Sequence, residues 1–412
     1  MNKIFTICLI GILFGGMISV SASNLKIKNT NLLGNIIYVD DDGGVDFTKI
    51  QDAIDNAKNG DTVFVYSGTY YENIIFYGDK SINLIGENKE STIINGEANN
   101  QEGVIQIYND NVNISKFTIT NGRYGIWLQK ELQDITIEDC IIIQNSWGIV
   151  SWVNISNLKI LNCEIINNNE KGIHIGNFKY KKDSVNVIKN CYFRSNKHKG
   201  LYVGNDLIKN SRDILNISNC VFEFNEQGIV LESTSNIFVY DCFINTSEWC
   251  GFTLFSSENV ELKNCEIFNN GVNGVHLGHS SKNNKIIDNT IIGSKDNGIY
   301  LDSSSGNIIQ YNNLIDNVQN AKDNSINNWK LNYYSDFDEE NEGAYDNDKD
   351  GIIDSSYKIP NGFNKDKYPL AEKDSKPDLN KCYQFQKIKS IIHPFLVKIF
   401  NQFPFLQHIL NL

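Results

Sequence analysis

Short apolar stretches alternate with polar turns along most of the chain, and this pattern repeats with a nearly constant period. Each copy contains a glycine followed by an apolar residue, any residue and a second apolar residue. The copies begin at Gly125, Gly148, Gly172, Gly200, Gly228, Gly251, Gly274 and Gly298, which are 23 to 28 residues apart. Apolar residues at every second position, separated by Asn, Gly and Ser, predict short strands and tight turns in each copy.

A second column keeps the same period, and each member is followed two residues later by Ile, Phe or Leu. Its members are Phe117, Cys140, Cys163, Cys191, Cys220, Cys242, Cys265, Asn289 and Asn312. One copy cannot bury its apolar side alone, but copies stacked about 4.8 Å apart can. Because parallel crossovers are almost always right-handed, we expect an all-β, single-stranded, right-handed parallel β-helix over residues 62–330. A two-sheet sandwich, the alternative, would not need a period kept over eight copies.

The cysteines occupy an inward position of this predicted helix. Stacked copies hold their side chains parallel, whereas a disulfide needs Cβ atoms that converge. The six column cysteines are therefore predicted to be buried, reduced and inert, and repeated asparagines are expected to form amide ladders at the turns. Cys250 and Cys382 lie outside the column.

Residues 36–61 predict a cap at the N-terminal end. We expect a strand at residues 36–40 and then an amphipathic helix whose capping box is formed by Thr48 and Gln51. Asn59 and Gly60 would stop this helix, a strand would follow at residues 61–65, and residues 68–73 would form a turn. Such a helix would cover the open end of the solenoid.

The two chain ends differ from the repeats. Residues 1–22 have a positive start, an apolar run and small residues at the end, which predicts a signal peptide; an uncleaved anchor is the alternative. Residues 373–412 begin with a polar linker and continue as an amphipathic tail interrupted by Pro394, Lys398 and Pro404. The tail is expected to cover the lower end of the solenoid, with a partner protein or a membrane surface as alternative targets. The formal net charge of −12 argues against nucleic acid as a partner.

These features carry a family resemblance. Residues 37–73 resemble the N-terminal cap of pectin-lyase-like β-helices, and the repeats resemble the carbohydrate-binding and sugar-hydrolase module of NosD-type periplasmic proteins. Residues 331–372, with Tyr333–Tyr334 and Lys367–Leu370, resemble the segment that closes many NosD-like solenoids. The resemblance implies the fold and a secreted or extracytoplasmic location, with association with the cell surface as an alternative. It leaves function open, because this fold hosts lyases, hydrolases, esterases and non-enzymes.

The closing segment contains an Asp-rich loop. Asp346, Asp348 and Asp350 supply oxygens at alternate positions, Gly351 follows, and Ile352 and Asp354 complete the first part of a calcium loop. Tyr357 stands where an EF-hand has its bidentate carboxylate, so Asp336, Asp338 or Glu339 would have to fill that place. We expect structural calcium here, and a solvated acidic turn is the alternative.

Outward-facing residues of the glycine-led strands predict a ligand surface. Aromatic and imidazole side chains suit the apolar faces and hydroxyls of sugars, although aromatic residues also simply favour strands. The candidates are Trp127, Trp152, His174, Tyr202, His276 and Tyr300. The two longest repeats also carry insertions at the same phase, and these would form a basic wall from Lys181, Lys182, Lys209 and Arg212.

Catalytic chemistry is less well defined. The candidate carboxylates are Glu232, Asp206 and Asp302, but Glu232 and Asp302 lie three repeats, or about 14 Å, apart. That separation exceeds the roughly 5 Å or 6.5–9.5 Å of glycosidase pairs. We expect an exported glycan-binding protein, with a polysaccharide lyase or glycoside hydrolase, and a structural or adhesive surface protein, as alternatives. Copper handling is not favoured, because both methionines lie in residues 1–22 and most cysteines face inward.

Overall fold

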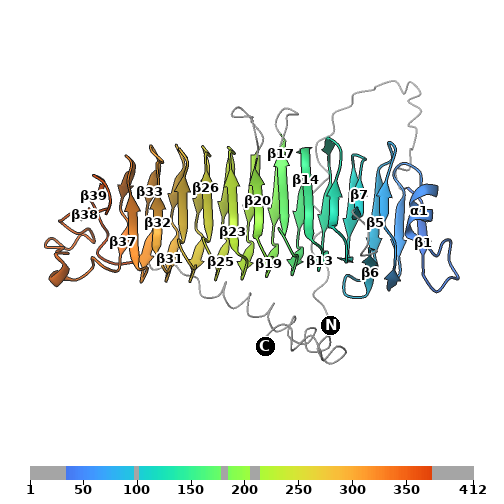
Figure 1. The fold of residues 1–412 in the computed structure, drawn as a ribbon, viewed down its shortest axis with the longest axis horizontal. Coiled ribbons are helices and arrows are strands. Elements are labelled where there is room, and N and C mark those ends of the chain that lie inside the picture. Colours follow the sequence, from blue (N-terminus) through green and yellow to red (C-terminus); the bar gives the residue numbers. More distant parts are fainter. Residues whose placement is uncertain (1–33, 97–101, 178–183, 205–213, 374–412) are drawn as a thin grey trace, which may run out of the picture. The chain divides into compact units, whose positions relative to one another are not determined.

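The computed structural model describes residues 34–96, 102–177, 184–204 and 214–373. They form a right-handed solenoid whose wall consists of three long parallel sheets, each contributing one strand to a rung (Figure 1). The sequence prediction of a parallel β-helix is therefore confirmed. The predicted signal peptide and nearly all of the tail lie outside the described residues. Within the described part of the chain, no helix has both the length and the apolar character needed to cross a membrane.

Sheet A has thirteen strands that pair in the following order. They are β1 (Ile36–Val39), β2 (Thr62–Val65), β5 (Ile82–Gly86), β8 (Val112–Ser115), β12 (Thr136–Glu138), β15 (Lys159–Leu161), β18 (Val185–Lys189), β21 (Ile214–Ser218), β24 (Ile237–Tyr240), β27 (Glu261–Lys263), β30 (Lys285–Ile287), β33 (Ile308–Gln310) and β36 (Asn328–Lys330).

Sheet B has twelve parallel strands, which pair in the following order along the solenoid. They are β3 (Gly68–Tyr70), β6 (Thr92–Asn95), β9 (Thr118–Thr120), β13 (Ile141–Ile143), β16 (Glu164–Ile166), β19 (Tyr192–Arg194), β22 (Val221–Glu223), β25 (Phe243–Asn245), β28 (Glu266–Phe268), β31 (Thr290–Ile292), β34 (Asn313–Ile315) and β37 (Tyr333–Tyr334).

Sheet C contains the glycine-led strands, and the short β11 (Leu132–Gln133) pairs with one of them, β14. The others are β4 (Ile74–Phe76), β7 (Gly103–Ile107), β10 (Tyr124–Leu128), β14 (Trp147–Ser156), β17 (Ile173–Asn177), β20 (Lys199–Gly204), β23 (Gln227–Glu232), β26 (Phe252–Phe255), β29 (Val275–Gly278), β32 (Asn297–Leu301) and β35 (Gln319–Asp323). The remaining elements are helix α1 (Ile50–Asn56), the 3-10 turn η1 (Glu340–Glu342) and the antiparallel pair β38 (Tyr357–Lys358) and β39 (Lys365–Asp366).

The core consists of like residues stacked from rung to rung. In sheet C, Ile126, Ile149, Ile173 and Leu201 occupy one register column, and each is at most 1% exposed. Two of the largest core side chains, Phe193 and Phe222, stack with their ring centroids 4.4 Å apart. Each inward residue is thus buried against its copies above and below, as the constant period requires.

Buried asparagine ladders line the corners of the solenoid, as predicted. In one of them Asn145 donates to Asn168, Asn168 to Asn196 and Asn196 to Asn225, through side-chain bonds of 3.3, 2.9 and 3.0 Å. Because each amide also bonds to a backbone carbonyl, these buried polar groups are satisfied within the stack.

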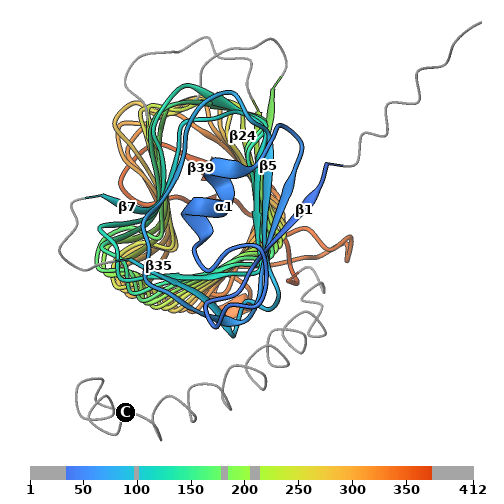
Figure 2. The ribbon, with the colours of Figure 1, turned by 90° about the vertical axis from the view of Figure 1, so that its right-hand side faces the viewer.

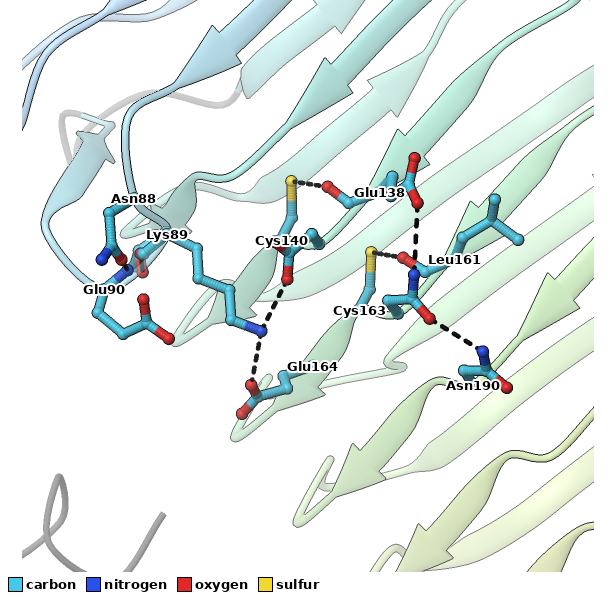
Figure 3. A network of polar contacts seen from close by, with 12 residues as sticks. Asn88, Lys89, Glu90, Glu138, Cys140, Leu161, Cys163, Glu164 and Asn190 are labelled. Atoms are coloured by element: carbon cyan, nitrogen blue, oxygen red, sulfur yellow. Dashed lines mark hydrogen bonds and ion pairs between the residues drawn. The ribbon is translucent and has the colours of Figure 1, made fainter. Parts of the chain in front are cut away.

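The cysteine column lies inside the wall, as predicted. All six thiols are free and at most 2% exposed, and Cys250, which the column did not include, is also buried and free. Each column thiol donates to a backbone carbonyl; Cys140 Sγ, for example, lies 3.3 Å from the Glu138 oxygen (Figure 3). Cys382 lies outside the described residues.

We expect these seven thiols to stay unmodified when the folded protein is treated with N-ethylmaleimide, because a buried thiol neither ionises readily nor meets the reagent. Mass-spectrometric mapping of the peptides before and after denaturation in guanidinium checks this. Labelling of any column cysteine in the folded protein would contradict the packing described above.

Helix α1 lies over the N-terminal end of the solenoid, as Figure 2 shows along the axis. Its apolar face is buried as expected, but the predicted capping box is wrong. Lys49, not Thr48, is the N-cap residue, and its side chain forms no capping hydrogen bond. Instead the Glu72 carboxylate accepts hydrogen bonds from the Ile50 and Gln51 amides at 2.9 and 3.0 Å. Gln51 reaches across to the backbone of Ile75. Glu72 is brought in by the next rung, so a tertiary contact replaces the local one.

The predicted turn at residues 68–73 is also corrected. Gly68–Tyr70 is strand β3, the first strand of sheet B, and pairs with β6. Tyr70 is buried in the core, and its hydroxyl donates to the Tyr66 carbonyl.

A lysine clamps three rungs together on the outside of the wall. Lys89, in the connection between β5 and β6, reaches Asp139 and Glu164, with Nζ 3.1 Å from each carboxylate. Figure 3 shows its contact with Glu164. Burial by itself would lower the pKa of Lys89, but the two carboxylates outweigh it and raise that pKa. Lys89 is therefore a fixed cation that ties residues 75 positions apart.

Replacing Lys89 by Met should lower the free energy of unfolding by about 1–2 kcal/mol, because Asp139 and Glu164 lose their shared partner. Lys130→Met is the matched control, since Lys130 is exposed and its replacement removes the same charge. Equal urea midpoints for the two variants would show that the clamp contributes nothing.

Candidate functional site

The candidate ligand surface is the outer face of sheet C. Its register places Trp127, Val150, His174 and Tyr202 in one column on successive rungs. The column continues through Val230, Thr253, His276 and Tyr300. This face is less open than the sequence suggested, because His174 is only 8% exposed and the three smaller residues are buried.

Glycines make room for the rings. A glycine follows His174, Tyr202 and His276 two residues later, and a Cβ atom there would lie within 4 Å of each of these side chains. A Cβ atom at Gly204 would lie only 2.2 Å from Tyr202 Oη. In the sequence, the spacing of a ring residue, any residue and a glycine therefore indicates that the ring lies along the strand.

An aromatic cluster forms the N-terminal part of this surface. Trp152, which is 40% exposed, packs against Trp127, Trp147 and His174, with ring centroids 5.8, 6.2 and 6.0 Å apart. The pairing of β14 with β17 shifts register just after Ser151, next to Trp152. Trp147 was not among the residues predicted from the sequence, because it precedes the glycine of its repeat and belongs to no outward column.

Two lysines complete the cluster. Lys171 Nζ lies 3.0 Å from His174 Nδ1 and 3.9 Å from the centroid of the Tyr202 ring, and His174 stacks on Tyr202 at 4.9 Å. Lys199 Nζ lies 4.9 Å from the same ring. Among the described residues, neither lysine forms an ion pair with a carboxylate. Sequence reasoning missed both, although each directly precedes the glycine of its repeat.

The electrostatics of this lysine–histidine–tyrosine group are unusual. Burial, with Lys199 close by, lowers the pKa of Lys171 to about 8. Burial, together with Lys171 and Lys199, lowers the pKa of His174 to about 3. Near neutral pH the group therefore holds a neutral imidazole beside an amine that loses its proton unusually easily.

The candidate carboxylates do not form a pair. Tyr202 Oη donates to Glu232 at 2.9 Å, so Glu232 belongs to the lysine group. Glu232, Phe255 and Gly278 are register neighbours, and Asp302 lies one rung further on, where it accepts hydrogen bonds from Ser303 and Asn324. The predicted separation of three rungs holds. Asp206, Lys181, Lys182, Lys209 and Arg212 lie outside the described residues.

A second ring stack lies further along the same column. His276 stacks on Tyr300 with centroids 5.1 Å apart, and Lys322 Nζ lies 4.7 Å from the Tyr300 ring. Phe255 packs edge-on against His276 and against His279. Burial lowers the pKa of His276, whose buried Nε2 has no hydrogen-bond partner in the described part of the chain.

The Asp-rich loop brings three of its predicted ligands together. Carboxylate oxygens of Asp346, Asp348 and Asp350 lie within 4.8 Å of one another. A hydrogen bond from the Asp350 amide lowers the pKa of Asp348, but repulsion from Asp350, Asp354 and Asp346 outweighs it, so that pKa is raised. Asp354 instead accepts two hydrogen bonds from Asn347, at 3.0 and 2.7 Å. Asp336, which the sequence offered as a further ligand, accepts hydrogen bonds from Asn320 and Tyr357.

Comparison with known proteins supports the fold. Residues 154–315 match the model of the right-handed β-helix region, and residues 54–212 match that of the periplasmic copper-binding protein NosD. No curated protein matches the chain. The chain thus resembles both families, and the two matches overlap at residues 154–212.

Several solved structures are also similar. The A-module of mannuronan C-5 epimerase AlgE4 from Azotobacter vinelandii is 18% identical, with a TM-score of 0.47 over 68% of this chain and 90% of that one. Alginate lyase from Paenibacillus sp. is 14% identical, with a TM-score of 0.41 over 67% and 95%. Pectin methylesterase from carrot is 12% identical, with a TM-score of 0.39 over 61% and 84%. At such low identity the likeness concerns the fold alone.

Proposed function

We propose that this NosD-like β-helix protein binds an acidic polysaccharide outside the cytoplasm, along the outer face of sheet C. The observation that carries the proposal is the pair of amines, Lys171 and Lys199, held against the Tyr202 ring. Such amines, partly buried and without a carboxylate partner among the described residues, favour an anionic ligand that would take that place. The matched NosD family is described as periplasmic, and this description and the predicted signal peptide support a location outside the cytoplasm.

Neighbouring residues suit a sugar ring attached to that anion. The exposed Trp152 offers an apolar surface, while Tyr202 and Glu232 offer a hydroxyl and a carboxylate for sugar hydroxyls. Trp127 lies beside Trp152, and His276 and Tyr300 extend the same face. The basic insertions with Lys181, Lys182, Lys209 and Arg212 follow β17 and β20 directly in the sequence, and we include them in the proposed surface.

A polysaccharide panel tests this function. The chain from about residue 23 is incubated with immobilised neutral and acidic polysaccharides, and retention, new reducing ends and unsaturated-uronate absorbance are recorded. We expect retention on acidic polymers, falling as salt rises. Equal retention on neutral and acidic polymers, or none at all, would overturn the proposal.

Polysaccharide lysis is the second candidate, and the lowered pKa of Lys171 favours it. An amine with a pKa of about 8 is partly a free base near neutral pH. It would take the proton α to a uronate carboxylate, the C4–O bond would break, a C4–C5 double bond would form, and an acid would protonate the leaving oxygen. Lys171→Arg separates the two functions, since it keeps the charge for binding but lacks the base; unsaturated product from the parent protein alone would establish the lyase.

We also propose structural calcium at Asp346, Asp348 and Asp350, with the Ile352 carbonyl and Asp354 as the further predicted ligands. The close carboxylates and the glycine turn support it, although Asp354 would have to leave Asn347. The ion would tie the loop together and take no part in sugar chemistry. We do not extend copper binding from the matched family to this chain, because the six column thiols are buried.

Calcium at a hundredfold excess over Kd should raise the free energy of unfolding by about 2.7 kcal/mol. The melting temperature should rise accordingly. Asp348→Asn should abolish this shift, measured by differential scanning fluorimetry with and without calcium. Asp42→Asn, in the other acidic group Asp40–Asp42, is the control. A shift that survives Asp348→Asn would place the ion elsewhere.

A further inference from the structure

A separate groove crosses the corner where sheet A turns into sheet B. It has a volume of about 490 Å³ and extends over the rungs of β24, β27, β30 and β33. A second hollow of about 380 Å³ continues from it over the outer face of sheet A, and the two share Tyr240 and Lys263. This corner groove contains none of the residues of the sheet C surface.

The register shows how the lining of this groove is arranged. Tyr240 and Lys263 lie in one outward column, and the turn residues Asp241, Asn264, Asp288 and Tyr311 follow directly, all with positive φ between 52° and 58°. Tyr240 is 36% exposed and Tyr311 43% exposed, and they stand at the two ends. Three rungs, about 14 Å, separate them. The shorter side chains of Asn264 and Asp288 lie on the two rungs between the rings, so a recess with aromatic ends results.

The lining is polar and slightly acidic. Asn264 donates to Asp241, Lys263 lies 3.7 Å from Asp288, and at the base Asn313 donates to Thr290 at 3.3 Å. The carboxylates of Asp241 and Asp288 and the amine of Lys263 line the groove. The adjoining hollow adds apolar surface from Val185, Ile214 and Phe238. An acidic polymer would be repelled here, in contrast to the lysine pair on sheet C.

Amide, carboxylate and hydroxyl groups between two exposed tyrosines suit the hydroxyls and apolar faces of uncharged sugars. We propose that the corner groove is a second glycan site, and that it binds a short uncharged oligosaccharide. The site stands independently of the proposed function on sheet C, since it uses another sheet and the opposite charge preference. With both sites occupied, the protein would link an acidic to a neutral polysaccharide.

The test uses linear, uncharged tetrasaccharides of glucose, mannose and xylose as probes, with tetragalacturonate as the acidic reference, in titration calorimetry of the full chain. We expect one or more of the uncharged probes to bind, with an affinity that does not change with salt. Tyr240→Ala and Tyr311→Ala should each weaken this binding by about tenfold. Tyr240→Phe should retain most of it, because the ring remains. Tyr71→Ala, an exposed tyrosine on the N-terminal cap, is the matched control.

The outcomes separate the two sites. Loss of uncharged-sugar binding in the two alanine variants, with retention on acidic polymers unchanged, would support the corner groove. The inference is overturned if no uncharged probe binds at about 10 mM, or if both alanine variants bind like Tyr71→Ala. Failure of acidic polymers to bind would contradict the sheet C surface and leave this groove unaffected. Circular dichroism melts of each variant exclude unfolding as the cause.

Discussion

Replacing Lys171 by Ala should weaken binding of an acidic polysaccharide by roughly 10- to 100-fold, the effect of losing a charge-assisted hydrogen bond. The amine contacts His174 and Tyr202 and has no carboxylate partner among the described residues. A ligand carboxylate would therefore give this amine a direct ionic partner. The variant leaves the core untouched, since Lys171 lies outside the wall, so folding should be preserved.

Binding should also depend on pH through this amine. The pKa of Lys171 is about 8, so the amine is charged below that pH and becomes neutral above it. Affinity for a uronate polymer should hold between pH 6 and 7 and fall as pH rises through about 8. An ordinary surface lysine would keep its charge to beyond pH 10. Substrate binding itself would shift the midpoint upward, because a bound anion favours the charged amine.

Lys159→Ala is the matched control, because Lys159 is exposed on sheet A and removes the same charge. Isothermal titration at several pH values compares the parent and both variants. The proposed site would be wrong if Lys171→Ala and Lys159→Ala bound alike, or if the parent bound equally well at pH 7 and pH 9.5.

The fold could be read from the sequence because a solenoid repeats one local rule. Once the glycine and cysteine columns are aligned, each residue's neighbours above and below follow from the period, and the strand pairing confirms this register. Burial of the cysteines and the asparagine ladders follow for the same reason. Contacts between successive rungs are thus visible in the sequence, since they join equivalent positions.

What could not be read are contacts between positions that are not equivalent. Lys171 lies in a turn, and only the stacking of rungs places its amine over Tyr202 of the next rung. Trp147 and Lys199 were missed for the same reason. At the N-terminal cap, a local rule predicted Thr48 and Gln51, but Glu72 from the following rung caps the helix. Lys89 similarly reaches across rungs that no period connects.

The C-terminal end shows how a ladder is closed. Along one corner the amides of Asn289, Asn312 and Asn332 each donate to the next member, and the last one donates to Asp366 at 3.0 Å. The same carboxylate accepts from the Leu331 and Tyr368 amides and from Tyr334 Oη. Asp366 has no exposed surface. Strand β39 therefore supplies an acceptor that a further rung would otherwise provide.

Asp366→Ala should accordingly destabilise this end by about 3–5 kcal/mol, because several buried donors lose their acceptor at once. Since each rung of a solenoid contacts only its neighbours, the loss should stay local. Amide hydrogen exchange in residues 328–337 should become faster, while exchange in sheets A to C near β14 should not change. Asp366→Asn should have a smaller effect, because one carbonyl oxygen remains to accept.

Asp79→Ala is the control, since Asp79 is exposed near the other end and changes the charge equally. If Asp366→Ala left exchange at residues 328–337 as slow as Asp79→Ala does, the carboxylate would not be what closes the ladder. If exchange instead accelerated along the whole solenoid, the rungs would unfold as one unit. In that case stability at the end would set the stability of the sheet C surface as well, and variants of Asp366 would weaken polysaccharide binding without touching the ligand.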